Sequence, residues 1–160
     1  MLILAEGIRI STNVRVTVRD LAGFIEHVRD IHNKVTNGYL NKLRDARMGI
    51  VTDLTVSHVA WGSGTAAPAA TQTQLVTELG RKALTDRTAG GTGAMTDTLY
   101  IAPDEALVEI NELGGFVGGT MAPNSGTMIW RVLYDHPQNP KTNRQSIQID
   151  RTDTFSEYVA

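Results

Sequence analysis

The sequence predicts a single, mainly β domain, with a β-sandwich-like body and an N-terminal helical segment. The chain has 160 residues, about the length of one domain. Most of it consists of short segments rich in β-branched residues between turns of small residues, which is typical of sandwiches and barrels. One stretch near the N-terminus instead repeats its apolar residues every three or four positions, as a helix does. We therefore divide the domain into a strand and helical segment at 1–50 and a β-rich body at 51–160.

An extended segment at 3–18 opens the N-terminal part. Valines alternate with polar residues along its second half, as in a strand with one buried face. The Ser-Thr-Asn sequence at 11–13 is expected to form a turn or a bulge within it. Asp20 then follows, a residue type that caps helix N-termini, so we expect a helix to begin there.

The next segment is predicted to be helical. Its apolar residues occupy positions a and d of about two heptads: Leu21, Phe24, Val28, Ile31 and Val35. The pair Asn37-Gly38 is expected to end this helix, and a second short helix is expected from Tyr39 to Arg47. Two interpretations of the apolar stripe stay open. It packs on its own domain, or it forms an oligomer seam between copies of the chain.

The body is predicted to contain several short strands. Extended segments are expected at 51–61, 82–88, 96–102, 106–110, 127–135 and 146–155. A short helix is expected at 72–80, and loops of small residues at 62–70 and 89–93. Both alternating sets of residues in 127–135 are apolar, which indicates burial on both faces. Residues 137–140 are expected to form a hairpin-like loop between the last two strands.

Composition excludes several classes of function. The net charge is −2 and the basic residues are scattered, which argues against nucleic acid as a partner. No stretch approaches the ~18 apolar residues of a membrane span, and the first residues do not read as a signal peptide. The absence of cysteine excludes disulfides, thiolate metal sites and cysteine nucleophiles.

The search for chemistry predicts no catalytic, cofactor-binding or metal-ligating residue, and so no enzyme. The four histidines lack the spacing of a ligand pair: His27, His32, His58 and His136. The glycine-rich stretches at 90–93 and 114–119 lack phosphate-loop spacing and are expected to be bends and bulges. Three acids without an EF-hand pattern are expected at the solvated surface: Asp97, Asp150 and Asp153.

Two stretches, taken in order, resemble a segment found in virion proteins of tailed bacteriophages, mainly tail-fibre and baseplate-associated subunits. The first is VSHVAWGSGTAAPAATQTQL at 56–75, followed by ELGRK at 78–82. The second is VEINELGGF at 108–116, followed by SGTMIWRV at 125–132 and PKT at 140–142. The resemblance covers roughly residues 51–156. The chain departs from it at Gly115, where leucine is common, and in its longer helical segment.

The resemblance implies a structural component of a phage virion, such as a tail-fibre, baseplate or connector attachment subunit. Its partners would be other copies of itself, with a trimer as a plausible assembly, and other virion proteins. Two alternatives are a capsid decoration protein and a small glycan-binding module for host recognition. Glycan binding would require exposed aromatic rings, for which the candidates are Trp61, Tyr100, Phe116 and Trp130.

Overall fold

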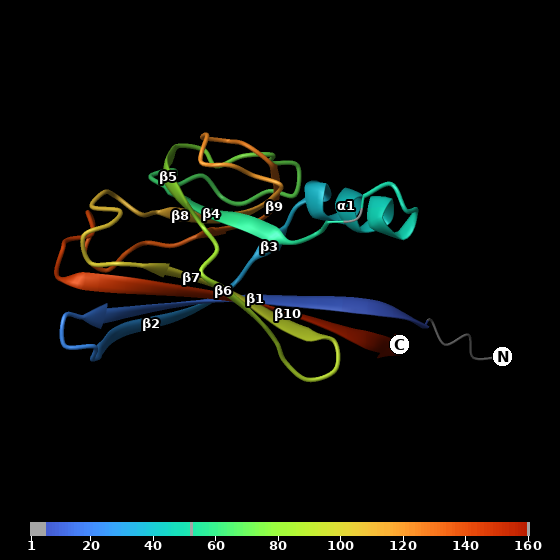
Figure 1. Ribbon diagram of the computed structural model, residues 1–160, viewed down its shortest axis with the longest axis horizontal. Coiled ribbons are helices and arrows are strands. Elements are labelled where there is room, and N and C mark those ends of the chain that lie inside the picture. Colours follow the sequence, from blue (N-terminus) through green and yellow to red (C-terminus); the bar gives the residue numbers. More distant parts are fainter. Residues whose placement is uncertain (1–5, 52, 160) are drawn as a thin grey trace.

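Two antiparallel five-stranded sheets pack face to face, and a short helix lies beside them in the computed structural model (Figure 1). The structure describes residues 6–51 and 53–159. The first sheet contains, in spatial order, β2 (Ile25–His32), β1 (Glu6–Asp20), β10 (Gln145–Val159), β7 (Ala94–Ile101) and β6 (Asp86–Ala89). The second contains β3 (Lys34–Val35), β9 (Thr127–Leu133), β8 (Glu112–Val117), β4 (Val56–Gly62) and β5 (Glu78–Ala83). The mainly β prediction and its sandwich-like body are confirmed.

The core forms where alternating apolar residues of the two sheets meet. Every second residue of a strand points to the same face, so the valines of β1 line up toward the second sheet. They join a single buried cluster to which both sheets contribute: Val14, Val16, Val18, Leu99, Ile147 and Ile149 from the first, and Val59, Leu113, Ile129 and Val132 from the second. The alternation therefore buries one face of β1, which confirms the prediction of a strand with one buried face.

The second sheet is buried on its outer face as well. A small apolar cluster lies there, which consists of Ala60, Leu75, Phe116 and Met128. Leu75 belongs to the long connection between β4 and β5, so this loop covers the sheet. The central residues of β9 are buried in succession, which confirms the prediction for 127–135.

The helix α1 (Asn37–Arg47) confirms the second of the two predicted helices. The Thr36 hydroxyl caps it by accepting a hydrogen bond from the backbone N–H of Tyr39 at 3.3 Å. Arg44 and Arg47 lie in its last turn, where their positive charges interact favourably with the negative end of the helix dipole. The Asn37-Gly38 pair begins this helix, so the prediction that it ends a preceding helix is wrong.

The helix predicted through residues 21–35 is also wrong, because β2 and β3 occupy this region. Asp20 caps a hairpin turn rather than a helix: its Oδ1 accepts hydrogen bonds from the N–H groups of Ala22 and Phe24, both at 2.9 Å. The returning chain then pairs with β1, which needs a neighbour to satisfy its backbone groups. The three- and four-residue spacing of apolar residues was compatible with a helix, but hydrogen bonding to β1 decides the strand.

Other boundaries also differ from the predictions. Residues 11–13 continue β1 without interruption, and the irregularity in its pairing with β2 lies at Val18/Arg19. No helix forms at 72–80 and no strand at 106–110. The loop containing 137–140 connects β9 of the second sheet to β10 of the first, so it is a crossover rather than a hairpin. The strand predicted at 82–88 is interrupted at 84–85, so its two parts belong to β5 and β6, which lie in different sheets. The remaining predicted strands are present with shifted ends, and the 89–93 turn joins β6 to β7.

Candidate functional site

A fully buried ion pair fastens the loop between β4 and β5 to the outer face of the second sheet. Glu112 begins β8, and its Oε2 lies 2.7 Å from Nε of Arg131 on β9. The carboxylate also accepts hydrogen bonds from three backbone N–H groups of the loop, those of Gly64, Val76 and Thr77. Arg131 in turn donates to the Ala66 carbonyl and the Gln72 side chain. One ion pair therefore holds both ends and the middle of the loop.

The electrostatics of Glu112 fit this role. Burial alone would raise its pKa, but the backbone N–H groups of Thr77 and Val76 and the Arg131 guanidinium outweigh burial. The pKa of Glu112 is therefore lower than the ordinary value, and the carboxylate is charged at neutral pH. A side-chain Cβ at Gly64 would collide with this carboxylate, which explains the glycine.

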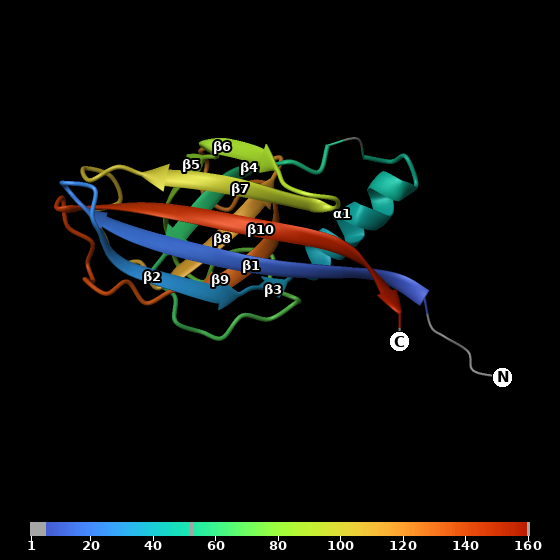
Figure 2. The same ribbon diagram turned by 90° about the horizontal axis from the view of Figure 1, so that it is seen from below.

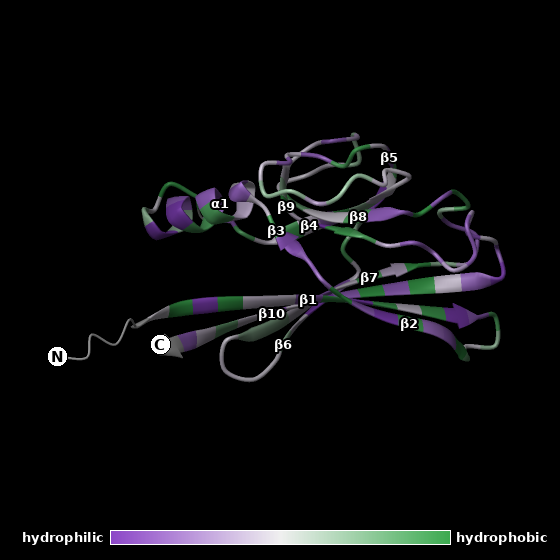
Figure 3. Cartoon of the chain, turned by 180° about the vertical axis from the view of Figure 1, so that it is seen from behind, coloured by the Kyte–Doolittle hydropathy of each residue, from purple (hydrophilic) through white to green (hydrophobic). Residues whose placement is uncertain are grey.

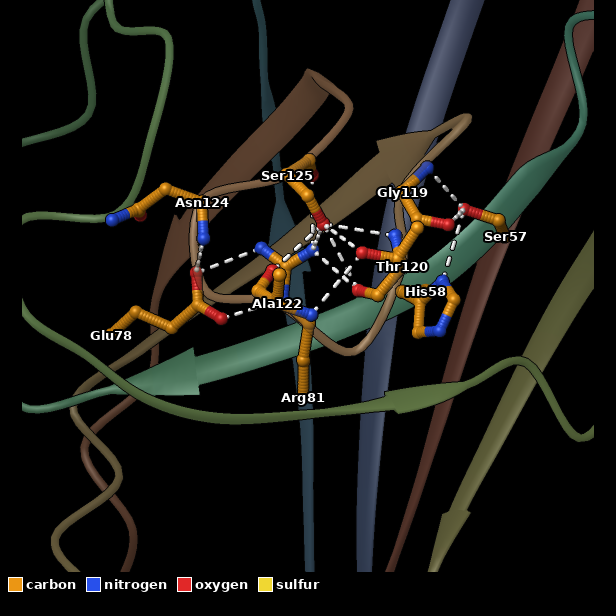
Figure 4. Close-up of polar contacts among 9 residues, drawn as sticks. All are labelled: Ser57, His58, Glu78, Arg81, Gly119, Thr120, Ala122, Asn124 and Ser125. Atoms are coloured by element: carbon orange, nitrogen blue, oxygen red, sulfur yellow. Dashed lines mark hydrogen bonds and ion pairs between the residues drawn. The ribbon is translucent and has the colours of Figure 1, made fainter.

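A second buried ion pair holds the loop between β8 and β9 (Figure 4). Nε of Arg81 lies 2.6 Å from Oε1 of Glu78, on the same strand β5. Nη1 of Arg81 donates to the carbonyl oxygens of Thr120 and Ser125, and Oε2 of Glu78 accepts from the N–H of Asn124. The guanidinium also lies 4.5 Å from the centre of the Phe116 ring.

Ser57 and His58 lie next to this cluster, and their side chains approach each other at 3.1 Å (Figure 4). Ser57 Oγ accepts from the N–H of Gly119 at 2.8 Å and donates to the Phe116 carbonyl at 3.1 Å. The hydroxyl is thus hydrogen-bonded to the loop backbone. Burial, followed by the nearby charge of Arg81, lowers the pKa of His58, so its ring is neutral at pH 7. This arrangement fixes the loop.

The third buried charged cluster joins the helix to β10. Asp153 Oδ2 lies 2.8 Å from Nη2 of Arg151 and accepts a hydrogen bond from the Tyr39 hydroxyl at 3.3 Å. The Arg151 guanidinium lies over the rings of Tyr39 and Trp130. Burial, with a contribution from Asp153, raises the pKa of Tyr39 to about 12. Burial also raises the pKa of Asp153 despite the neighbouring arginine.

Two of the three acids predicted to be solvated are therefore buried. Asp153 is 5% exposed, and Asp97 is 6% exposed and pairs with Arg87 at 2.7 Å. Asp150 is half-buried and accepts a hydrogen bond from the Thr98 hydroxyl. Asp97 lies in β7, and Asp150 and Asp153 lie in β10. The pairing of these strands buries the side chains of Asp97 and Asp153, and the spacing of the acids along the sequence did not reveal this burial.

Several charged residues at 78–82, 108–116, 125–132 and 140–142 anchor loops, whereas Glu109 is exposed. Glu78, Arg81, Glu112 and Arg131 form the two ion pairs described above. Lys141 is 2% exposed, and its ammonium donates to the carbonyl oxygens of Ala102, Pro103, Glu105 and Thr142. The ion pairs and hydrogen bonds of these five side chains hold long loops in place.

The departure at Gly115 has a direct structural explanation. A Cβ at this position would overlap the indole ring of Trp130 on the neighbouring strand β9. The tryptophan thus fills the space that a larger residue in β8 would occupy.

The five residues predicted as an oligomer seam do not form one stripe. Ile31 and Val35 pack against the sandwich core. Leu21 and Phe24 lie in the β1–β2 turn, 68% and 73% exposed, and Val28 lies on the outer face of β2, 44% exposed. The helix that was expected to carry the seam is absent, and contact of these residues with another copy stays a prediction. The turn exposes two large apolar side chains.

Three of the four aromatic residues suggested for glycan binding are buried. Phe116 and Trp130 belong to the core clusters, and Trp61 is 7% exposed beside a hollow of about 230 Å³. Tyr100 is 41% exposed and is the one of the four with an accessible ring.

Among residues 6–51 and 53–159, no group of three or more histidine, aspartate or glutamate side chains has the arrangement of a metal site. Within the same described ranges, no helix combines the length and apolarity required of a transmembrane span.

Comparison of the chain with protein-family models, with curated proteins and with solved structures gave no match in any of the three.

Sequence reasoning missed the pairing of Glu112 with Arg131. The two residues are 19 positions apart. Arg131 lies in the strand predicted at 127–135, whereas Glu112 lies between the strand predicted at 106–110 and the glycine-rich stretch at 114–119. The signal that could have found them is a charged residue within an apolar, doubly buried segment, since such a charge requires a partner.

Proposed function

We propose that the chain is a structural component of a phage virion that acts through self-assembly and contacts with other virion proteins. A tail-fibre, baseplate or connector attachment subunit is the role that the resemblance favours. The observation that carries the proposal is the use of the resembling residues as loop anchors. A protein that works as an architectural part needs its loops held rigidly, and buried ion pairs with several hydrogen bonds provide this.

The shape of the first sheet supports an assembly role. β1 and β10 pair over 15 residues, from Glu6↔Val159 to Asp20↔Gln145, and extend past the sandwich as a two-stranded arm (Figures 1 and 2). A two-stranded ribbon is marginally stable in water on its own, so contact with another protein would stabilise it. No step of catalysis is part of this proposal.

The test is whether the chain is present in particles. Phage particles from the culture that produces the chain are purified by density-gradient centrifugation, and their proteins are identified by peptide mass spectrometry. The proposal expects the chain to sediment with the particles at a fixed ratio to the major capsid protein. A chain that stays in the soluble fraction would contradict it.

Immunogold labelling of the same particles assigns the position. Labels at the tail, baseplate or neck agree with an attachment subunit. Labels spread evenly over the head would instead identify a capsid decoration protein and overturn the attachment role.

A further inference from the structure

A hollow of about 400 Å³ opens between the edge strand β2 of the first sheet and the end of β9 in the second. We call it the side hollow. Its lining comes from four parts of the chain: Arg29 in β2, Thr65 in the loop between β4 and β5, Asn111 just before β8, and Leu133 and Asp135 at and just after the end of β9. The volume lies in the range of sites that bind small molecules, which is about 300–1,000 Å³.

Arg29 occupies a position that apolar residues usually take. It pairs with Val16 across the sheet, so it shares with Ile31 the side of β2 that faces the second sheet. Hydrophilic bands dominate β2 in Figure 3, and Arg29 is exposed although its partner Val16 belongs to the core. At the rim of the core, Arg29 thus forms part of the wall of the side hollow.

Asn111 fixes two walls of the side hollow relative to each other. Its side-chain amide donates to the Ser63 carbonyl at 3.1 Å, and its backbone N–H donates to the Gly62 carbonyl at 2.8 Å. Its own carbonyl accepts a hydrogen bond from the N–H of Tyr134 at 2.8 Å, which holds the chain just before Asp135. The start of the β4–β5 loop and the end of β9 are therefore joined through one residue.

The buried ion pair described above positions Thr65. The residue before it, Gly64, donates its N–H to Glu112, and the residue after it, Ala66, accepts a hydrogen bond from Arg131. Thr65 lies between these two fixed points, and its side chain lines the side hollow. The hollow is thus formed before any ligand binds, which lowers the entropy cost of binding.

Two opposite charges line the side hollow without pairing with each other. Arg29 and Asp135 are both exposed, and neither takes part in an ion pair among the residues that the structure describes. Burial raises the pKa of the Tyr134 hydroxyl, while the charge of Arg29 opposes this shift and that of Asp135 enhances it. Both charges therefore lie within electrostatic range of the same hydroxyl. A ligand with a negative and a positive group would meet both of them favourably, whereas a ligand with one charge would also face its own sign.

We propose that the side hollow binds a small zwitterion with an apolar side chain, of the class of α-amino acids and dipeptides. The planar guanidinium of Arg29 suits a carboxylate, to which it donates two parallel hydrogen bonds. Asp135 accepts hydrogen bonds from the ammonium group of the ligand. Leu133 supplies apolar surface on which the side chain of the ligand packs. This inference goes beyond the virion role and does not depend on it.

The first experiment is a titration with L-leucyl-L-leucine, followed through two-dimensional NMR spectra of the backbone amides. Saturable shifts are expected at 65, 111, 133 and 135 below about 20 mM, because a ligand this small binds in the micromolar to millimolar range. The N-acetylated and the C-amidated forms of the dipeptide each lack one charge and should each bind about tenfold or more weakly. A parallel titration with L-leucine decides between the two members of the class, since the tighter ligand identifies the length that the hollow takes.

The second experiment removes each protein charge in turn. Arg29→Gln should weaken binding of the dipeptide about tenfold or more. In this variant, amidation of the ligand's carboxylate should cost nothing further, because the guanidinium that it meets is gone. Asp135→Asn should behave in the same way toward acetylation of the ammonium group. The matched controls, which should bind as the wild type does, are Arg9→Gln in β1 and Asp104→Asn in the loop after β7, both at exposed positions.

Three results would overturn the site. The first is the absence of saturable shifts up to about 20 mM, which would leave Arg29 as an inward charge that protects the edge of β2 from pairing. The second is equal affinity for the dipeptide and its two singly charged forms. The third is a loss of affinity in the control variants as large as that in Arg29→Gln and Asp135→Asn. The dispersion of the NMR spectra establishes that each variant is folded, which is expected because the substituted side chains are exposed.

Discussion

Glu112 shows how much depends on a single buried carboxylate. It pairs with Arg131 and accepts three backbone hydrogen bonds, while both side chains of the pair are fully buried. Hydrophobic residues can replace some buried ion pairs at little cost. Replacement of this pair by hydrophobic residues would be destabilising, because the N–H groups of Gly64, Val76 and Thr77 would lose their acceptor.

The first prediction concerns this residue. Glu112→Gln leaves the Arg131 charge buried without a counterion, so we expect the unfolding free energy to fall by about 3–5 kcal/mol. The matched control is Asp45→Asn, which breaks the surface pair with Arg44 and should cost less than about 1 kcal/mol. Urea unfolding followed by tryptophan fluorescence measures both values. Equal losses in the two variants would show that the buried pair does not hold the loop as described.

The pKa of Glu112 gives a second prediction, about pH. Because its pKa is lowered by folding, its stabilising contribution is complete above the ordinary glutamate pKa of about 4.3 and is lost as the pH falls below it. Glu112→Gln lacks this contribution at every pH. The gap in unfolding free energy between wild type and variant should therefore narrow from pH 7 to pH 3. A gap that stays constant would contradict the lowered pKa.

At the scale of elements, β8 and β9 interlock through a glycine and a tryptophan. Gly115 leaves the space that the Trp130 indole occupies, so the two strands approach closely. The sequence shows two adjacent glycines at 114–115, but it does not show that Trp130 requires the second one. That relation depends on the register between the two strands, which only the assembled sheet fixes.

The third prediction tests this contact. Gly115→Ala forces the Trp130 ring or the strand to move, and we expect a loss of about 1–3 kcal/mol in unfolding free energy. Gly91→Ala is the matched control, since its Cβ would meet nothing within 4 Å in the β6–β7 turn. Thermal unfolding should show a lower midpoint for Gly115→Ala alone. An unchanged midpoint would mean that the close packing of β8 on Trp130 is tolerant.

The segment at 21–35 shows where element prediction from sequence fails. Its apolar spacing fits a helix, and Asp20 fits a helix cap, yet both residue patterns also suit a hairpin. An aspartate that caps a helix can equally accept the N–H groups of a tight turn, as Asp20 does with Ala22 and Phe24. Pairing with β1 decides between the two conformations. A strand at 25–32 satisfies backbone N–H and C=O groups of β1 by hydrogen bonding, whereas a helix would leave them without this partner.

At the scale of the whole molecule, one core joins both sheets. Residues from the first sheet, such as Val16 and Ile149, share a buried cluster with residues of the second, such as Val59 and Ile129. If the two sheets separated, the apolar inner face of each would be exposed to water. We therefore expect the chain to unfold as one unit.

The fourth prediction follows from this shared core. Trp61 and Trp130 both lie in the second sheet, so their fluorescence reports that sheet, while far-ultraviolet circular dichroism reports both. The two urea transitions should coincide. Val16→Ala, a core change in the first sheet, should shift the fluorescence midpoint downward as much as the dichroism midpoint. Two separated transitions, or a shift in one signal alone, would show that the sheets unfold independently.

The sequence by itself determined the mainly β class, the half-buried first strand, the doubly buried segment at 127–135 and the helix that ends at Arg47. These features depend on alternation and capping among near neighbours, which a linear chain displays. Only the tertiary structure decided that 25–32 pairs with β1, that Glu112 meets Arg131, and that β1 pairs with β10 over 15 residues. The physical reason is that strand pairing and buried charge join residues far apart in the chain, and the backbone and electrostatic groups that they satisfy are not adjacent in sequence.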